Sequence, residues 1–469
     1  MIVKRGITNG RQAFLVSAAR FFETICYRGG KEKLMQKNSF RLLRKPLHLG
    51  IMEKEVEFME LFKDLCVRPG TFFLPRKEEN MEAWAVVACD QYTAQKDVWQ
   101  QAYDFVDGQP SALRLIIPEA YLDESDSRVP QVQSAMERYL SSGILTEAVS
   151  GMVLVRRVTQ SGARLGLVLT VDLEAYSFAA DSKSAIRPTE GTIVSRIPPR
   201  QKVRRGAKLE LSHVLLLCDD VNRTIIEPVY AKRDALRKMY DTKLMLGGGS
   251  IEGWAVEDEE TLGQIADAIR ALKANLPENG ILFAVGDGNH SLATAKAHWE
   301  EVKAGLSEAE KADHPARFAM VELNNIYDDA LIFEPIHRVI FGVDGEAVLS
   351  MLQDAGLMED EEHPDLILVT KQGETAYRIT RPLHSLPVGT VQQLLDRQPG
   401  LNLDYVHGDK AVREIVEKQN AVGILLPPMD KSLLFPAVAK NGPLPRKTFS
   451  MGEANEKRYY MEARKITRG

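Results

Sequence analysis

One stretch, residues 281–306, constrains the fold more than any other part of this chain. Its first five residues, Ile-Leu-Phe-Ala-Val, form a short apolar run with glycine on both sides. Such a run predicts a strand that is buried on both faces. From Leu292 onward, apolar residues recur at spacings of three and four, which is the stripe of an amphipathic helix. The sequence therefore predicts a strand, a tight polar turn at residues 286–291, and a helix.

Such a junction has two interpretations. The first backbone N–H groups of a helix lack intrahelical acceptors, and the helix dipole adds partial positive charge, so the turn can bind an anion such as a phosphate. Alternatively, Gly286 and Gly288 only form the bend, Asn289 or Ser291 caps the helix, and nothing binds. The turn alone leaves both interpretations open.

Length and composition limit the kind of protein. A chain of 469 residues is too long for one small core, which predicts two or three domains. No run of about 18 apolar residues occurs, so we expect no membrane association. The four cysteines form no C-x-x-C pair, which favours a reducing compartment and a cytoplasmic location.

Charge is distributed unevenly along the chain. The first 50 residues contain eleven lysines and arginines against two glutamates, whereas the whole chain has a net charge of −5, which leaves −14 for the rest. We do not expect nucleic acid as a partner, because its phosphates must be neutralised by cations. We predict that residues 1–51 are a basic extension ahead of the true start at Met52; a targeting or partner-binding arm is the alternative.

The body alternates strand and helix patterns, which predicts an α+β (mixed α/β) protein with mixed sheets and packed helices. We place an N-terminal region at residues 52–245 and a C-terminal region, which carries the polar turn, at residues 246–469. The predicted elements include strands at 84–89 and 113–117, a hairpin of 151–158 with 165–173, a helix at 259–274, paired strands at 318–323 and 330–333, and a hairpin of 366–370 with 375–380. Asp90 and Gln91 follow the first strand, where ligand crevices of α/β sheets form.

Two basic segments are further candidates. The pair Pro198-Pro199 argues against a strand or helix interior, and if the following residues are extended, their side chains alternate. Arg200, Lys202 and Arg204 would then project to one side and neutralise a polyphosphate or carboxylate ligand, although a solvated basic loop is the simpler alternative. His337 and Arg338 are either structural groups of a strand or ligand contacts.

Several kinds of site can be excluded. His290 and His298 would lie about 12 Å apart on a helix, too far for one metal ion, and no metal site is predicted. His290 and Ser291 are adjacent helical residues that point in different directions, which disfavours a nucleophile and base pair. Neither a G-x-S-x-G elbow, a P-loop nor a complete G-x-G-x-x-G fingerprint is present.

The motif Asp287-Gly288-Asn289-His290-Ser291, with Thr294 and Ala295 after it, resembles the signature of the uncharacterised, mainly bacterial family called domain of unknown function 1015 (DUF1015). The resemblance extends over most of residues 75–465 and includes the segments 86–91, 197–200, 335–338 and 445–448. The family signature is Asp-Gly-His-His-Arg, so Asn289 replaces a histidine and Ser291 replaces an arginine. The second change removes a bidentate phosphate donor.

More distantly, the Asp-Gly-x-His pattern looks like the phosphate-binding turn of the partition-protein B and sulfiredoxin superfamily, which includes free serine kinases. This resemblance implies nucleotide binding at the helix start. We therefore expect a nucleotide-dependent enzyme, a small-metabolite phosphotransferase that uses ATP or ADP with Mg²⁺. Its expected site comprises Asp287, His290 and Glu190 as catalytic residues and Gly288, Asn289, Ser291, Arg200, Lys202, Arg204, His337 and Arg338 as cofactor-binding residues.

Two other functions remain open. A non-catalytic nucleotide-sensing or partner-binding protein would bind nucleotide without turnover. A hydrolase or isomerase would use His290 and Asp287 for acid/base chemistry, which suits a histidine near its ordinary pKa of about 6.5. A small-molecule ligand is expected in every case, and the oligomeric state is undetermined.

Overall fold

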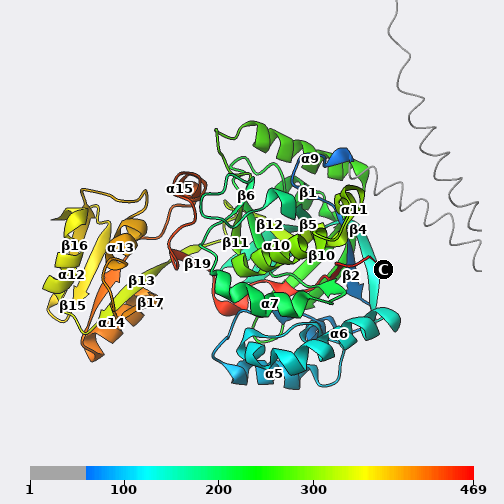
Figure 1. Ribbon diagram of the computed structural model, residues 1–469, viewed down its shortest axis with the longest axis horizontal. Helices are drawn as coiled ribbons and strands as arrows, with labels where there is room; N and C mark the ends of the chain where they lie inside the picture. The colour runs from blue at the N-terminus through cyan, green and yellow to red at the C-terminus, as the bar shows by residue number, and fades with distance from the viewer. Residues whose placement is uncertain (1–59, 469) are drawn as a thin grey trace, which may run out of the picture. The chain divides into compact units, whose positions relative to one another are not determined.

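The computed structural model describes residues 60–468 (Figure 1). These residues belong to one compact unit, Met59–Gly469, and the predicted basic extension at residues 1–51 lies outside the described residues. The large sheet draws strands from both sides of residue 245. The division into two regions at that position stays a prediction.

The large sheet has ten strands, eight of them in the order β6-β11-β8-β12-β5-β4-β10-β9. β11 is parallel to β6 and β12 is parallel to β8, whereas the other pairs are antiparallel, so the sheet is mixed as predicted. The strand bounds are β1 Val67–Arg68, β2 Gly70–Pro75, β4 Leu145–Thr159, β5 Gly162–Asp172, β6 Ile186–Pro188, β8 Leu215–Cys218, β9 Arg237–Lys243, β10 Ser250–Val256, β11 Phe283–Asp287 and β12 Phe318–Asn325.

The centre of this sheet is covered on both faces. Successive residues of β4 and β5, including Val153, Leu154, Val168 and Leu169, are all buried. Side chains alternate between the two faces of a strand, so a continuous apolar run needs cover on each side. The predicted hairpin of β4 and β5 is confirmed by their antiparallel register.

Helices α4 to α11 accompany the large sheet. Their bounds are α4 Met81–Trp84, α5 Lys96–Val106, α6 Ser125–Ser141, α7 Ile197–Arg204, α8 Glu227–Ala231, α9 Glu259–Ala274, α10 Asn289–Lys303 and α11 Glu308–Asp313. α9 has the predicted bounds, and the Asp258 side chain caps it by accepting the Thr261 N–H at 2.8 Å. α7 and α10 lie side by side (Figure 1). The predicted strand at 113–117 is wrong, because a 3-10 helix, η1 Ala112–Leu115, occupies that position.

The second sheet is antiparallel. Its strands are β13 Phe333–Phe341, β14 Leu357–Glu359, β15 Leu366–Thr370, β16 Gly373–Ile379, β17 Leu403–His407, β18 Ala421–Leu425 and β19 Phe449–Met451, with helices α12 Gly345–Met351, α13 Pro387–Leu395, α14 Asp409–Lys418 and α15 Leu434–Asn441. The predicted hairpin of β15 and β16 is confirmed. The predicted pairing of 318–323 with 330–333 is wrong, because β12 pairs with β5 and β8 in the large sheet while β13 belongs to the second sheet.

The last strands of the chain return to its early segments. β20 Tyr459–Tyr460 pairs with β3 Val86–Val87, and β21 Arg464–Lys465 pairs with β7 Leu209–Glu210. These short pairings bring the residues after β3 next to the C-terminal segment. Among residues 60–468, every helix is too short or too polar to cross a membrane.

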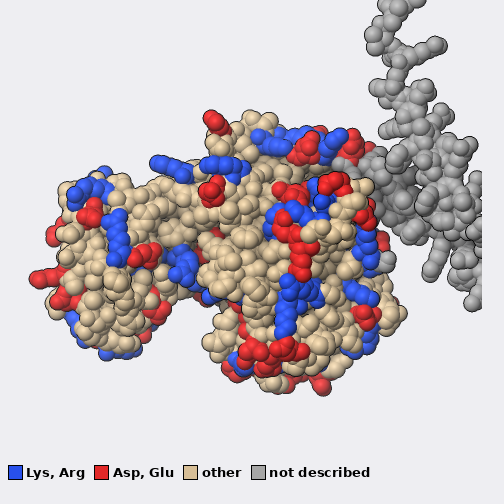
Figure 2. Space-filling model, viewed as in Figure 1, with Lys and Arg blue, Asp and Glu red and all other residues tan. Residues whose placement is uncertain are grey.

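Charged side chains are interspersed over the face shown in Figure 2. Lysines and arginines alternate there with aspartates and glutamates, and no extended basic surface is visible on that face. A continuous row of cations is what binding to a nucleic-acid backbone needs.

Candidate functional site

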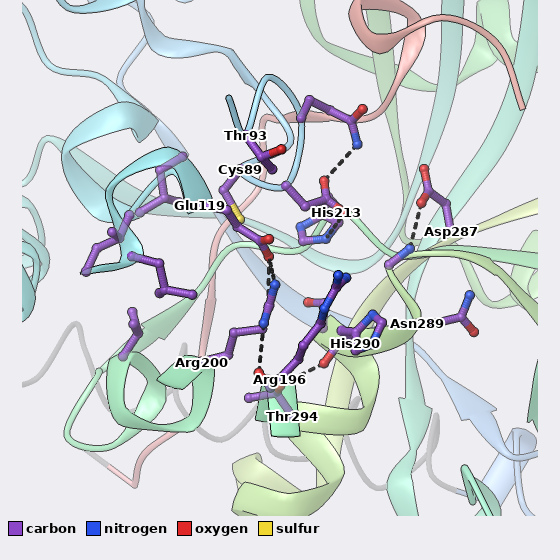
Figure 3. A pocket seen from close by; sticks show the side chains of 18 of the residues that line it. Cys89, Thr93, Glu119, Arg196, Arg200, His213, Asp287, Asn289, His290 and Thr294 are labelled. Carbon is purple, nitrogen blue, oxygen red and sulfur yellow. Dashed lines mark hydrogen bonds and ion pairs between the residues drawn. The ribbon is translucent and has the colours of Figure 1, made fainter. Parts of the chain in front are cut away.

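A cavity of about 940 Å³, which we call the central pocket, lies where several distant segments meet (Figure 3). Its wall is contributed by residues 89–93 after β3, residues 115–122, the segment 190–211 that contains α7, the start of α10, and residues 446–460. The polar turn predicted as the functional site therefore lies in the wall of a pocket. The sequence did not indicate which other segments would complete it.

The N-terminal end of α10 has no side-chain cap. Gly288 is its N-cap residue, and neither Asn289 nor Ser291 accepts a hydrogen bond from the first turn. The Gly288 N–H donates to Asp287 Oδ1 at 2.9 Å, and the buried Asn289 Oδ1 has no partner among the described residues. Asn289 and Ser291 therefore do not cap the helix, which corrects that part of the simpler interpretation. The first N–H groups of this 15-residue helix lack a side-chain acceptor.

The backbone of this turn strongly favours glycine at position 288. Its φ is 74°, in the left-handed region that favours glycine. A Cβ at this position would lie 3.0 Å from the Val214 Cα and 3.2 Å from the His213 Cδ2. The turn thus lies directly against the segment that leads into β8.

His290 is a neutral side chain with one nitrogen already engaged. Its Nε2 accepts the Ile193 N–H at 3.1 Å. Burial, together with the charges of Arg200 and Arg196, lowers the pKa of His290 to about 4. The acid/base hypothesis assumed an ordinary histidine pKa, and this premise is not met. The geometry leaves Nδ1 as the nitrogen that carries the proton at neutral pH.

The histidine that is charged at this site is His213. Its Nε2 lies 3.5 Å from Asp90 Oδ2, and its Nδ1 hydrogen-bonds Tyr460 Oη at 2.7 Å. Burial opposes a charge on His213, but Asp90 prevails and raises the pKa of His213 well above 6.5. Burial also opposes a charge on Asp90, yet His213 lowers the pKa of Asp90. Asp90 is thus a fixed anion in the pocket wall.

Sequence reasoning found Asp90 by its place after a strand but missed His213 and Tyr460. These two residues are separated by 247 positions. No local pattern predicts their contact, because it forms only when the C-terminal strands β20 and β21 pair with β3 and β7.

We expect the pKa values of the two pocket histidines to be shifted in opposite directions from the ordinary value, upward for His213 and downward for His290. His213 gains stability from its charge below pH 6.5 and loses it as pH rises through its raised pKa. His290 stays neutral in the folded protein down to about pH 4, whereas in the unfolded chain it binds a proton near pH 6.5. The free energy of unfolding therefore falls as the pH is lowered from 6.5 to about 4. Side-chain NMR of the full chain, assigned with His213→Gln and His290→Gln, measures both midpoints. Two midpoints near the ordinary value would contradict this arrangement.

Both predicted catalytic carboxylates, Asp287 and Glu190, lie in the wall. Asp287 Oδ2 is 3.4 Å from Lys457 Nζ, and Glu190 Oε1 accepts the Lys447 N–H at 3.2 Å. Burial raises the pKa of Glu190, and the Lys447 charge offsets part of this. Both carboxylates thus lie beside a lysine.

Residues 200–204 are helical, which corrects the extended conformation expected for them. Arg200 Nε donates to Glu119 Oε1 at 2.8 Å, Lys202 pairs with Asp126, and Arg204 Nη2 lies 2.5 Å from Glu210 Oε2. Residues four apart share a helix face, so Arg200 and Arg204 line the pocket. Lys202 is not among the residues that line it. All three cations already have a carboxylate partner.

His337 and Arg338 lie in β13, outside the pocket wall. His337 Nδ1 accepts the Leu426 N–H at 3.1 Å, and its Nε2 lies 2.8 Å from Asp409 Oδ1. The fully buried Arg338 donates to the carbonyl oxygens of Lys447 at 3.0 Å and Arg446 at 3.3 Å. Arg338 therefore holds the segment that brings Arg446 and Lys447 to the pocket.

Four cations of the wall were missed as site residues: Arg196, Arg446, Lys447 and Lys457. The side chains of the first three have no ion pair among residues 60–468, and all three residues are exposed. Arg446 and Lys447 lie within the segment 445–448, which carried part of the family resemblance. The family resemblance of this segment was the sequence feature that could have pointed to Arg446 and Lys447.

Only one group of described residues has the spacing of metal ligands, namely Glu334, His407 and Glu453. It lies outside the central pocket. His407 approaches Glu334 with Nε2 at 2.8 Å and Glu453 with Nδ1 at 3.4 Å. One ligand atom from each of the three residues lies within 4.8 Å of those of the other two. Exposed acidic groups commonly have this spacing without a metal ion, so we do not assign the cluster as a metal site.

The fold and the pocket together define a mixed α/β protein with a cavity, lined by charged residues of both signs, at an uncapped helix start. A family model described as "Protein of unknown function (DUF1015)" matches residues 70–398. The chain belongs to this family. No curated protein matches its sequence.

Solved structures show distant likeness. A conserved hypothetical protein from Pyrococcus furiosus is 12% identical, and the alignment covers 64% of this chain and 95% of that one at a TM-score of 0.32. A free serine kinase in complex with AMP is 12% identical, with 64% and 92% covered and a TM-score of 0.34. C-terminally truncated SbnI from Staphylococcus aureus is 10% identical, with 61% and 83% covered and a TM-score of 0.33.

Proposed function

We propose that this protein is a nucleotide-dependent enzyme, a phosphotransferase that acts on a small hydroxylated metabolite. The observation that supports it most directly is the uncapped start of α10 in the wall of the central pocket. Backbone N–H groups and the helix dipole favour an anion at such a position. The phosphates of ATP or ADP, with Mg²⁺, are the proposed occupants.

The charges around the pocket support a polyanionic ligand. Arg196, Arg446 and Lys447 come from two separate segments, and none of their side chains forms an ion pair among residues 60–468. By contrast, Arg200 and Arg204 are paired with Glu119 and Glu210. Cations without partners remain able to form charge-assisted hydrogen bonds with a phosphate.

The remaining groups fit the other tasks of phosphoryl transfer. Asn289 and Ser291 offer backbone N–H groups to the phosphate, while Gly288 allows its close approach. Asp287 and Glu190 supply carboxylate oxygens, the ligand type that Mg²⁺ prefers, or orient the accepting hydroxyl. Positioning and electrostatic stabilisation provide most of the catalysis in this class of reaction.

Isothermal titration of the full chain with ATP, ADP and CTP, each with and without Mg²⁺, tests the proposal. We expect binding that weakens at least about tenfold when Arg446 and Lys447 are both replaced by alanine, because charge-assisted bonds contribute roughly 1.5–3 kcal/mol each. Lys371→Ala, in the exposed turn between β15 and β16, is the control. Absence of heat with every nucleotide would remove the proposal. Binding without turnover of any hydroxylated metabolite would support the nucleotide-sensing alternative instead.

A further inference from the structure

Backbone hydrogen bonds fix the position of Arg196, which is the N-cap residue of α7, next to the start of α10. It is the last residue of the 3-10 helix η4, Val194–Arg196, and its N–H donates to the Ile193 carbonyl at 2.9 Å. Its own carbonyl oxygen accepts from Arg200 Nη1 at 2.7 Å. The Ile193 N–H donates in turn to His290 Nε2 at 3.1 Å. The backbone at Arg196 is therefore fixed relative to the first turn of α10.

The side chain of Arg196, in contrast, is not held by another residue. It has no ion pair or hydrogen bond among residues 60–468, and it lines the central pocket. Figure 3 shows it extending into the pocket beside His290. Its charge is felt there, because Arg196 contributes to the lowered pKa of His290 after burial and Arg200.

The guanidinium of the neighbouring Arg200, unlike that of Arg196, already has hydrogen-bond partners. The Arg200 guanidinium is occupied by Glu119 and by the Arg196 carbonyl oxygen. Arg338, the other arginine predicted to bind the cofactor outside residues 200–204, lies outside the pocket wall. Among the described arginines near the start of α10, Arg196 has a free guanidinium.

We propose that Arg196 is the guanidinium that binds the phosphoryl group of the ligand, in place of the arginine that the family signature has at position 291. Ser291 and Arg196 line the same pocket, one from α10 and the other from η4. A guanidinium presents paired N–H donors that match two phosphate oxygens. The inference rests on the proposed nucleotide-binding function and names the group that recognises the phosphate.

The experiment compares ADP, inorganic pyrophosphate and adenosine as probes in calorimetric titrations. We expect Arg196→Ala to weaken ADP and pyrophosphate binding roughly 10–100-fold, because it removes a charge-assisted hydrogen bond. Adenosine binding should not change. Ser291→Arg introduced into Arg196→Ala should restore most of the ADP affinity. Arg397→Ala, an exposed arginine after α13 that does not line the pocket, is the matched control.

The outcomes separate the two proposals. Wild-type protein that binds none of the probes removes the proposed function, and the role of Arg196 with it. Wild-type protein that binds ADP while Arg196→Ala binds it equally well overturns the role of Arg196 alone. A loss that extends to adenosine, or that Ser291→Arg does not restore, also overturns it, because the arginine would then not act on the phosphate. Arg196 is exposed, so unchanged melting temperatures should show that the variants are folded.

Discussion

Replacing Gly288 by alanine is expected to lower the free energy of unfolding by about 2–4 kcal/mol. Two effects add up at this position. A left-handed backbone, here with φ of 74°, is costly for any residue that has a Cβ. The new Cβ would also lie 3.0 Å from the Val214 Cα, which belongs to the backbone and cannot rotate away.

Urea unfolding followed by circular dichroism measures this loss. Gly263→Ala in α9 is the matched control, since a Cβ there meets nothing within 4 Å and the residue is inside a helix. That control should gain up to about 1 kcal/mol. If Gly288→Ala were as stable as the wild type, the turn could not have the described conformation.

Replacing Arg458 by methionine is expected to cost about 3–5 kcal/mol, because it leaves buried carboxylates without their partner. Arg458 Nε donates to Glu322 Oε2 at 2.9 Å and Nη2 donates to Glu462 Oε2 at 2.8 Å. The side chains of all three residues are at most 3% exposed. Arg458 thereby joins the C-terminal segment to the large sheet. Denaturant unfolding measures the cost, and Arg413→Met, which breaks an exposed pair with Glu374, should cost less than about 1 kcal/mol.

The cost of Arg458→Met should depend on pH in a defined direction. Burial opposes the charge of Glu322, but Arg164 and Arg458 prevail and lower its pKa below 4.5. A carboxylate with a lowered pKa stabilises the folded state above pH 4.5 and loses this effect as the pH falls. The difference between wild type and variant should therefore be largest near pH 7 and shrink below pH 4.5. A difference that grows on acidification would contradict the assignment.

Periodicity predicted the elements whose contacts are local. α9 and the two hairpins were found because repeated apolar spacing within one segment decides whether it forms a helix or a strand. The proline pair Pro198-Pro199 led to the wrong prediction of an extended segment after it, for a physical reason. Pro198 and Pro199 stand in the first turn of α7, where the missing N–H of proline has no helical acceptor to lose. The prediction of a strand at 113–117 was wrong because a short apolar run does not distinguish a strand from a buried 3-10 helix.

The candidate site likewise has a part that the sequence predicts and a part that it does not. The strand, the polar turn and the helix at residues 281–306 could be predicted, since steric preference and apolar spacing act within a few residues. The DUF1015 family could also be recognised from the motif and the segments around it.

The sequence by itself determined where a buried strand is followed by a polar turn and the start of a helix. That this helix start has no side-chain cap was seen only in the structure. Only the tertiary structure decided which charges face that start. Arg200 is paired with Glu119, 81 residues away, whereas Arg196 is left without a partner. His213 is charged because Asp90 lies beside it. The physical reason is that an ion pair depends on the distance between side chains from separate elements, and local sequence does not encode that distance.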